Sequence, residues 1–362
     1  MNQAIARLQI RAVATSPPQQ SAMIFLLTLL VWEARLAEEP SKGLLIVGGW
    51  CDGVSTELWG PDGTQCMLPD LSSRSQTLNV LQNRVIACYD KSCDELTDIG
   101  WVHAQDLLHQ RYFYTSIVTT DGMLLIGGAA VNGGNETEEL IPINQGPNQP
   151  AFSLEWWKYT DGSICSIKIN DTSLVLTGGD RSHSESMVTE LSKIGTWKNV
   201  GFKDLPKLNS GRAKHACGSY WLNDVQILIV AGGSDNNGVL LSSTELMNFM
   251  DQSSGWRESS ALPSARFALA GATITGVFHV TGGSRKDNQY CDDNHEILSW
   301  DSVGENWNLV GHTIMPRDSH AVTEIDFEDL KTFCTSTSTK ATTILSTTAV
   351  TTNPVTTTNT TS

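Results

Sequence analysis

The residues of this 362-residue chain that could do chemistry are its eight histidines, its eight cysteines and a few paired acidic residues. Their spacing matches none of the common catalytic patterns. The sequence holds no His-Glu-x-x-His, no Cys-x-x-Cys, no Walker loop, no Gly-x-Gly-x-x-Gly and no Gly-x-Ser-x-Gly. Asp292 and Asp293, which follow Cys291, have oxygen atoms suited to calcium, but their spacing matches no calcium loop. We therefore expect a protein that is not an enzyme and has no metal site or cofactor.

The histidines indicate structure rather than chemistry. His215 and His320 stand at the same place in two copies of the motif Arg-x-x-His-Ala, which begins at Arg212 and at Arg317. A residue that recurs with a motif usually serves the element that repeats, so we expect a structural role for both. His279 lies inside an apolar run, which predicts a place in the core.

The elements that would position such residues are short apolar runs, each of which ends in a pair of glycines. A run of this length, rich in β-branched residues, indicates a buried strand, and the glycines permit positive φ angles and close approach of another backbone. The pairs begin at Gly48, Gly127, Gly178, Gly232 and Gly282, with a period of about 50 residues from Gly127 onward. In the longer first gap a matching strand ends in Cys88 and Tyr89 instead of glycines, which makes six units.

Other positions keep the same period. An acidic residue followed by Leu or Ile comes after every strand of this kind. Four units then have a tryptophan, which we expect to pack between units: Trp101, Trp197, Trp256 and Trp307. Five units have an arginine before the next apolar run: Arg74, Arg111, Arg212, Arg266 and Arg317.

This pattern resembles the kelch repeat, over residues 43–327. The resemblance implies an all-β fold, a six-bladed kelch-type β-propeller. The first unit has no strand before its glycine strand, whereas the run Ser319–Phe327 has no glycine strand after it. We therefore expect the C-terminal strand to complete blade one, which closes the ring and removes exposed sheet edges.

The loops after the glycine pairs vary while the strands repeat. In repeat folds such variable segments gather on one face and often form the binding surface. Our candidate binding residues on this face are Trp50, Arg181, His183, Asp235, Asn236, Arg285 and Lys286. They favour a non-catalytic module that binds an extracellular protein or a glycan.

Two alternatives come from other propellers. Some kelch-like propellers are copper radical oxidases, which need a cross-linked tyrosine and cysteine, a second tyrosine and two histidines. Here Cys88 and Tyr89 are adjacent, but no recognisable histidine pair accompanies them. The other alternative, a cytosolic kelch adaptor or scaffold protein, usually has BTB and BACK domains, and it leaves the unusual composition of both termini unexplained.

Composition excludes some partners. The formal net charge is −15 and the lysines and arginines are scattered, so we expect neither nucleic acid nor anionic membranes as partners. Such a charge also keeps soluble proteins apart, and we expect a monomer.

The termini indicate secretion. Residues 1–37 form an arm whose apolar run, 23–32, is too short to span a bilayer but fits the core of a signal peptide, with the start at Met1 or Met23. Residues 335–362 are mostly Thr and Ser, which predicts a disordered tail of the kind that is O-glycosylated. We expect no stable membrane insertion.

The even number of cysteines favours disulfides in a secreted protein, although their connectivity does not follow from sequence. Repeat register favours the pairs Cys88–Cys93, Cys165–Cys217, Cys51–Cys66 and Cys291–Cys334. N-glycosylation triplets begin at Asn135, Asn170 and Asn359.

We predict that protein made in animal cells is found in the medium with an N-terminus near Glu38, because the apolar run would be removed on export. Peptide-mapping mass spectrometry of medium and lysate tests this, and should also find glycans on Asn135 or on the tail. Protein that stays in the lysate with an intact Met1 and reduced cysteines would contradict secretion.

Overall fold

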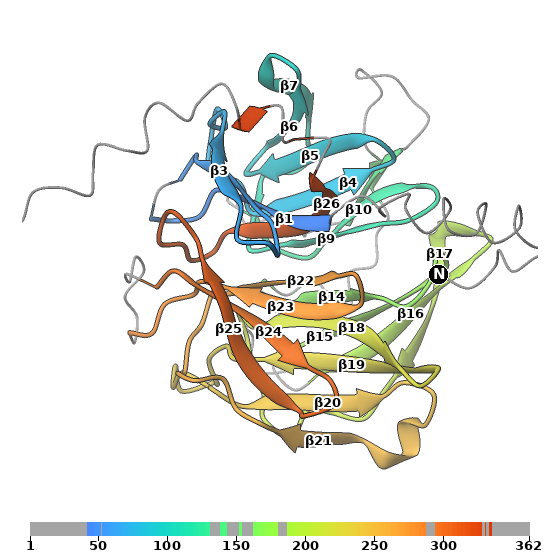
Figure 1. Cartoon of the computed structure of the whole chain (residues 1–362). Helices are drawn as coiled ribbons and strands as arrows, with labels where there is room; N and C mark the ends of the chain where they lie inside the picture. Colours follow the sequence, from blue (N-terminus) through green and yellow to red (C-terminus); the bar gives the residue numbers. More distant parts are fainter. Residues whose placement is uncertain are drawn as a thin grey trace, which may run out of the picture. The chain divides into compact units, whose positions relative to one another are not determined.

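The computed structural model of the chain describes residues 42–51, 53–130, 138–142, 152–153, 162–179, 187–286, 294–327, 330 and 333–334. These residues form six antiparallel four-stranded sheets, which are the blades of a six-bladed β-propeller (Figure 1). The predicted fold is therefore confirmed.

Each blade has its strands in order from the innermost, near the centre of the ring, to the outermost. Blade 1 consists of β26 (Ala321–Asp326), β1 (Lys42–Val47), β2 (Thr56–Trp59) and β3 (Gln65–Leu68). Blade 2 consists of β4 (Thr77–Leu81), β5 (Arg84–Tyr89), β6 (Ser92–Thr97) and β7 (Gly100–Asp106). Blade 3 consists of β9 (Thr115–Val118), β10 (Gly122–Ile126), β12 (Glu139–Pro142) and β13 (Phe152–Ser153).

The second half of the ring has the same plan. Blade 4 consists of β14 (Cys165–Lys168), β15 (Ser173–Thr177), β16 (Val188–Ile194) and β17 (Thr196–Asp204). Blade 5 consists of β18 (Ala216–Leu222), β19 (Val225–Ala231), β20 (Thr244–Asn248) and β21 (Trp256–Ser259). Blade 6 consists of β22 (Ala270–Ile274), β23 (Val277–Thr281), β24 (Glu296–Asp301) and β25 (Asn306–His312). Outside the blades lie the strand pair β8 (Arg111–Tyr112) with β11 (Ala129–Ala130) and the short helix η2 (Gln252–Ser254).

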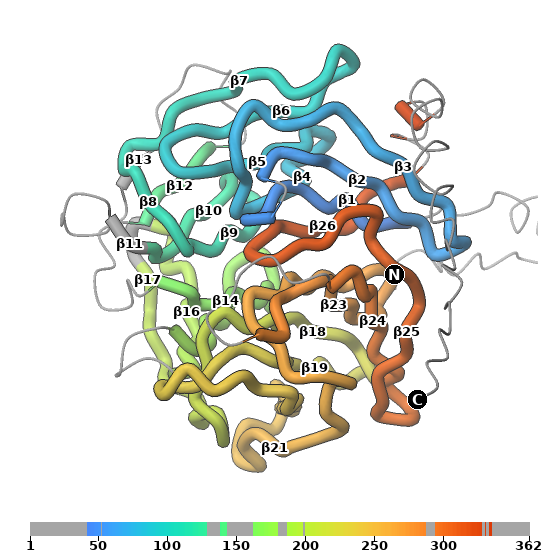
Figure 2. Tube along the Cα trace, turned by 90° about the vertical axis from the view of Figure 1, so that its left-hand side faces the viewer, coloured from blue at the N-terminus to red at the C-terminus, as the bar shows by residue number. Residues whose placement is uncertain are grey.

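The ring is closed by the C-terminal strand, as predicted. β26 pairs with β1 in antiparallel register from Lys42 opposite Asp326 to Val47 opposite Ala321, and Figure 2 shows the red strand beside the blue ones. The innermost strands β4, β9, β14, β18, β22 and β26 each contact the next around the ring.

The glycine pairs are sites of close packing. A Cβ atom on Gly178 would lie 2.3 Å from the carbonyl oxygen of Arg212, in the next blade. A Cβ atom on Gly233 would lie 2.6 Å from the carbonyl oxygen of Ala213, in its own blade. Both glycines have positive φ angles, 68° and 96°. The first glycine thus admits the neighbouring blade, and the second admits the segment that leads into its own blade.

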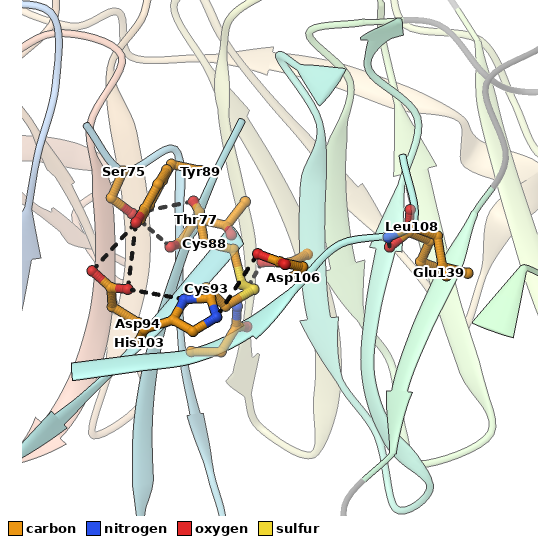
Figure 3. The surroundings of a disulfide bond; sticks show 12 residues. Ser75, Thr77, Cys88, Tyr89, Cys93, Asp94, His103, Asp106, Leu108 and Glu139 are labelled. Atoms are coloured by element: carbon orange, nitrogen blue, oxygen red, sulfur yellow. Dashed lines mark hydrogen bonds and ion pairs between the residues drawn. A yellow bond between two sulfur atoms is a disulfide. The ribbon is translucent and has the colours of Figure 1, made fainter. Parts of the chain in front are cut away.

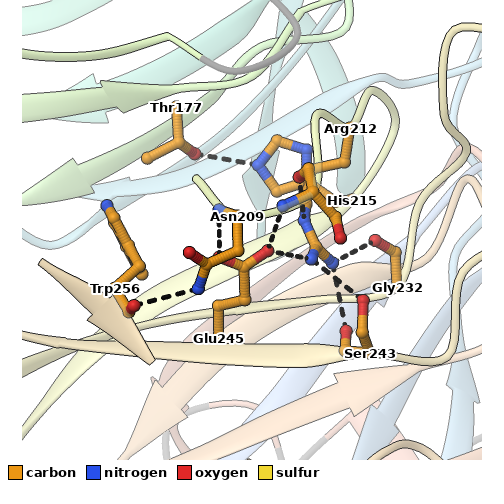
Figure 4. A network of polar contacts seen from close by, with 9 residues as sticks. Thr177, Asn209, Arg212, His215, Gly232, Ser243, Glu245 and Trp256 are labelled. Atoms are coloured by element: carbon orange, nitrogen blue, oxygen red, sulfur yellow. Dashed lines mark hydrogen bonds and ion pairs between the residues drawn. The ribbon is translucent and has the colours of Figure 1, made fainter. Parts of the chain in front are cut away.

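A buried arginine joins the glycine strand to the next strand in four blades. In blade 5, the Arg212 guanidinium lies 2.5 Å from Glu245 Oε1 and donates to the carbonyl oxygen of Gly232 at 2.9 Å (Figure 4). The carboxylate of Glu245 also accepts from the backbone N–H groups of Asn209 and Ser210. The same arrangement recurs for Arg111 with Glu139 and Gly127, Arg266 with Glu296 and Gly282, and Arg317 with Glu57 and Gly48.

The repeated tryptophans pack between units, as expected. The indole N–H of Trp101 in blade 2 donates to Thr56 in blade 1, and that of Trp307 in blade 6 donates to Thr244 in blade 5. Trp197 is buried, with 1% of its surface exposed.

Within the described residues, no helix has the length and apolar character that crossing a bilayer requires.

We predict that deletion of Ser319–Phe327 opens the ring, because β1 then loses its partner and exposes a sheet edge. The variant should aggregate or fail to be secreted, as measured by size-exclusion chromatography and by the yield in the medium. Truncation after Cys334 is the control and should leave both unchanged. A deletion variant that stays monomeric with an unchanged melting curve would refute closure by β26.

Candidate functional site

Six equivalent residues surround the centre of the propeller on the face that carries the glycine-pair loops. We call them the central ring; they are Gln76, Phe113, Ser163, Lys214, Ala268 and Ser319, one from each blade. Each precedes the innermost strand of its blade by one or two residues. The last five have positive φ angles between 50° and 62°, so the chain turns sharply as it enters each blade.

Backbone hydrogen bonds link the central ring from blade to blade. Ser163 N–H donates to the Phe113 carbonyl at 2.7 Å, and Lys214 N–H to the Ser163 carbonyl at 3.2 Å. Ala268 N–H donates to the Lys214 carbonyl at 2.8 Å, and Ser319 N–H to the Ala268 carbonyl at 2.7 Å. Blade 2 departs from this pattern, since the Gln76 side chain accepts from Phe113 N–H at 2.8 Å. The entrance of the ring is therefore held by four backbone hydrogen bonds and by the Gln76 side chain.

A cavity of about 110 Å³ lies inside the central ring. His215 and His320 line it, and each is buried and pairs through Nε2 with a threonine of the preceding blade: Thr177 Oγ1 at 2.8 Å and Thr281 Oγ1 at 2.6 Å. Burial, reinforced by the arginine three residues earlier, lowers the pKa of each histidine to about 3. Both rings are therefore neutral and structural, in agreement with the sequence prediction.

A second pocket, of about 280 Å³, adjoins this cavity and shares Gln76 and Ser319 with it. We call it the Trp50 pocket, after the side chain that follows the first glycine pair. Its other lining residues include Arg74, Asp90 and Tyr112. Blades 1, 2 and 3 thus each contribute to one concave site on the predicted binding face.

Trp50 and Arg74 form one wall of this pocket. Trp50 has 39% of its surface exposed, and the Arg74 guanidinium carbon lies 4.9 Å from the centre of its ring. Arg74 also lies close to Gly53, where an added Cβ would be 3.3 Å from Arg74 Cγ. The guanidinium is therefore held between the indole and the backbone while it stays exposed to solvent.

Arg74 stands at the repeat position that is buried in four other blades. Its blade has no glycine pair, and Glu95 is already held by Arg84, with Nε and Nη2 donating at 3.0 and 2.7 Å. Arg74 is therefore not needed inside the blade, and its charge is directed to the surface.

The disulfide Cys88–Cys93 occupies the place of the missing glycine pair (Figure 3). The two cysteines stand opposite each other in β5 and β6. Tyr89 follows in the position of the second glycine, and its hydroxyl lies 3.0 Å from Ser72 Oγ and 3.4 Å from Asp94 Oδ1. Blade 2 thus departs from the repeat at its glycine pair, and it borders the Trp50 pocket.

Two of the four expected disulfides are confirmed, Cys88–Cys93 and Cys165–Cys217. The pairs Cys51–Cys66 and Cys291–Cys334 are wrong, because Cys66 is bonded to Cys334. The reason is ring closure: after β26 the chain packs against blade 1, where Cys334 reaches Cys66 on the outermost strand. Cys51 instead lies on the loop face, where its thiol donates to Asp318 Oδ2 at 3.3 Å. Cys291 lies outside the described residues.

The candidate binding residues from the sequence analysis differ in their surroundings. Trp50 lines a pocket, whereas Asp235 accepts from the N–H groups of Asn237 and Val239, both at 2.8 Å, and so folds its own loop. The remaining exposed candidates are Asn236, Arg285 and Lys286. Arg181 and His183 lie outside the described residues.

Of the three N-glycosylation triplets, one can be placed. Asn170 is exposed in the turn between β14 and β15, and its side chain accepts from Thr172 N–H at 2.8 Å. Asn135 and Asn359 lie outside the described residues.

Sequence reasoning missed the pocket residues Arg74, Asp90 and Tyr112. The signal that could have found Arg74 is the combination of a recurring arginine position with a unit whose glycine pair is missing. An arginine that has lost the glycine carbonyl it normally binds can take another role.

The described residues do not provide the side chains that a copper radical oxidase needs. The sulfur of Cys88 is bonded to Cys93, so Cys88 is not available for a cross-link to a tyrosine. In the part of the chain that the structure describes, no three His, Cys, Asp or Glu side chains cluster in a way that would hold a metal ion.

No protein-family model matches the sequence, and no curated protein matches it. The structure is similar to that of a fungal alcohol oxidase of the AA5 family in complex with copper, with a TM-score of 0.53 and 13% identity over 77% of this chain and 66% of the oxidase. It is also similar to YjhT, with a TM-score of 0.53 and 13% identity over 75% of this chain and 98% of YjhT. The chain thus spans slightly less than two thirds of the oxidase. At this identity the likenesses show a shared propeller fold.

We predict that the folded state loses stability between pH 6.5 and about pH 3 through His215 and His320. The unfolded chain takes up protons on both below about pH 6.5, whereas the folded state keeps them neutral down to about pH 3. At pH 5 the loss relative to pH 7 should be about 2 kcal/mol for each histidine. Urea unfolding of the wild type and of the double variant His215→Gln, His320→Gln tests this. An equal loss in both proteins would contradict the assignment.

Proposed function

We propose that this protein is a secreted kelch-repeat propeller that binds an extracellular glycan or protein in the Trp50 pocket and does not act as an enzyme. The observation that carries the proposal is the exposed Trp50 beside the Arg74 guanidinium in a concave site. Tryptophan, tyrosine and arginine are enriched among the residues that contribute most to binding at protein interfaces. The repeat pattern in the sequence supports the kelch type.

The disulfides support an extracellular place of action. Three of them are present among the described residues, and such bonds persist in oxidising compartments and are rare in the cytosol. This argues against the cytosolic adaptor. The apolar N-terminal run and the Thr/Ser-rich tail, both noted in the sequence, are consistent with export.

A copper oxidase is the second candidate, and its support is the likeness in fold to the AA5 alcohol oxidase. The Cys88–Cys93 disulfide speaks against the cysteine–tyrosine cross-link that this chemistry would need. Metal analysis of protein expressed with added copper separates the two proposals, since a binding module needs no bound copper.

We predict that Trp50→Ala lowers binding about 30-fold, because it removes a large, exposed aromatic ring from the pocket wall. The measurement is binding of the fluorescently labelled protein to a printed glycan array and to fixed animal cells. Trp221→Ala is the matched control, since Trp221 is 61% exposed in β18 but lies at the end of the strand away from the glycine-pair loops. Equal binding by Trp50→Ala and wild type would refute the site.

A further inference from the structure

We propose that the Trp50 pocket binds an anionic saccharide, a sugar whose ring packs on Trp50, whose carboxylate or sulfate group pairs with Arg74, and whose hydroxyl group donates to Asp90. This inference rests on the proposed binding function and names the class of ligand. Three separate features of the pocket support it.

The first feature is the availability of the Arg74 guanidinium. In four blades the equivalent arginine is buried and pairs with a glutamate, at Arg111, Arg212, Arg266 and Arg317. Among the described residues no carboxylate pairs with Arg74, which instead contacts the face of Trp50. Stacking fixes the plane of the guanidinium and leaves its N–H groups for a ligand. A planar fork of N–H donors matches the two oxygens of a carboxylate or two oxygens of a sulfate.

The second feature is a carboxylate in the pocket wall. Asp90 lines the pocket together with Arg74 and Tyr112. A carboxylate accepts hydrogen bonds, and the hydroxyl groups of a sugar can donate them. The pocket therefore combines donors for an oxyanion with an acceptor for a hydroxyl group, and acidic sugars carry both groups.

The third feature is the local charge. The two adjoining cavities are lined by three charged side chains other than histidine: Arg74, Lys214 and Asp90. Two of the three are cations, in a chain with a formal net charge of −15. The Lys214 ammonium lies 5.4 Å from the Phe113 ring and 5.6 Å from the Phe267 ring, which holds it at the centre of the face. The lining of the two cavities thus has a positive balance of charge that favours an anion, although the chain as a whole is acidic.

Size and charge together limit the ligand to a short or terminal sugar. A volume of about 280 Å³ is small for a ligand pocket, which usually measures about 300–1,000 Å³. A long polyanionic chain would also be repelled by the net negative charge of the protein as a whole, −15. We therefore infer recognition of a single acidic residue at the end of a glycan.

The experiment is calorimetric titration of the full-length protein with three probes that differ in charge: methyl β-glucuronide, glucose 6-sulfate and methyl β-glucoside. We expect at least one anionic probe to bind about tenfold more tightly than the neutral glucoside, as one charge-assisted pair implies. Arg74→Gln should abolish that preference, so that the ratio of the affinities for the anionic probe and the glucoside falls from about ten to about one. The order of the two anionic probes shows whether a carboxylate or a sulfate is preferred, and either order supports the inference.

The matched control is Arg257→Gln, which removes an exposed arginine of β21 that pairs with Glu305 in the turn between β24 and β25, away from the pocket. It should keep the anionic preference, and thermal melting should show that both variants are folded.

Two results would overturn the inference while the proposed function stands. One is equal affinity for anionic and neutral probes, unchanged by Arg74→Gln. The other is the absence of binding to all three probes in a protein whose binding to cells still depends on Trp50. If no binding of any kind depends on Trp50, the proposed function itself fails.

Discussion

The propeller depends on a buried ion pair that four blades repeat. Each guanidinium binds a glutamate of the following strand and the carbonyl oxygen of the first glycine, and so fixes the loop that separates them. Removal of charges from water opposes this arrangement. Burial lowers the pKa of Arg212 although Glu245 opposes the shift, and raises the pKa of Glu57 although Arg317 opposes it. Such a pair contributes specificity of loop geometry more than net stability, whereas loss of one partner would cost about 3–5 kcal/mol.

The two blades without this pair show what replaces it. In blade 4, Glu190 lies 3.8 Å from Lys203, a looser contact on a partly exposed strand. In blade 2 a disulfide closes the turn covalently, and Arg84 takes over the glutamate. The covalent bond holds the loop without a buried guanidinium. Because the disulfide and Arg84 hold this blade together, Arg74 is not required in the interior and can lie at the surface as a cation.

The periodic features of the sequence predicted the fold because each has a single physical explanation. A glycine pair marks a place where another backbone approaches closely. The first and the last strand of the repeat region each lack a partner in sequence, which predicts that they pair and close the ring. The same reasoning found the Cys88–Cys93 and Cys165–Cys217 disulfides, whose partners are neighbours in the repeat register. It failed for Cys66, whose partner lies beyond the repeats. For the site, it found Trp50 but not Arg74, Asp90 or Tyr112, because a pocket between three blades is assembled from residues that share no sequence pattern.

The Cys66–Cys334 disulfide also affects how the ring resists a pulling force. β26 is held to β1 by backbone hydrogen bonds and by the ion pairs of Lys42 with Glu324 and Asp326, none of which is covalent. A pull on the chain beyond β26 would break these contacts one after another. Cys334 stands between β26 and the Thr/Ser-rich residues that follow, and it is covalently joined to β3. Tension applied through those residues is therefore transmitted to the outermost strand of blade 1 and bypasses the closing strand. A propeller tethered by its C-terminal segment would keep its ring, and with it its binding face, intact under load.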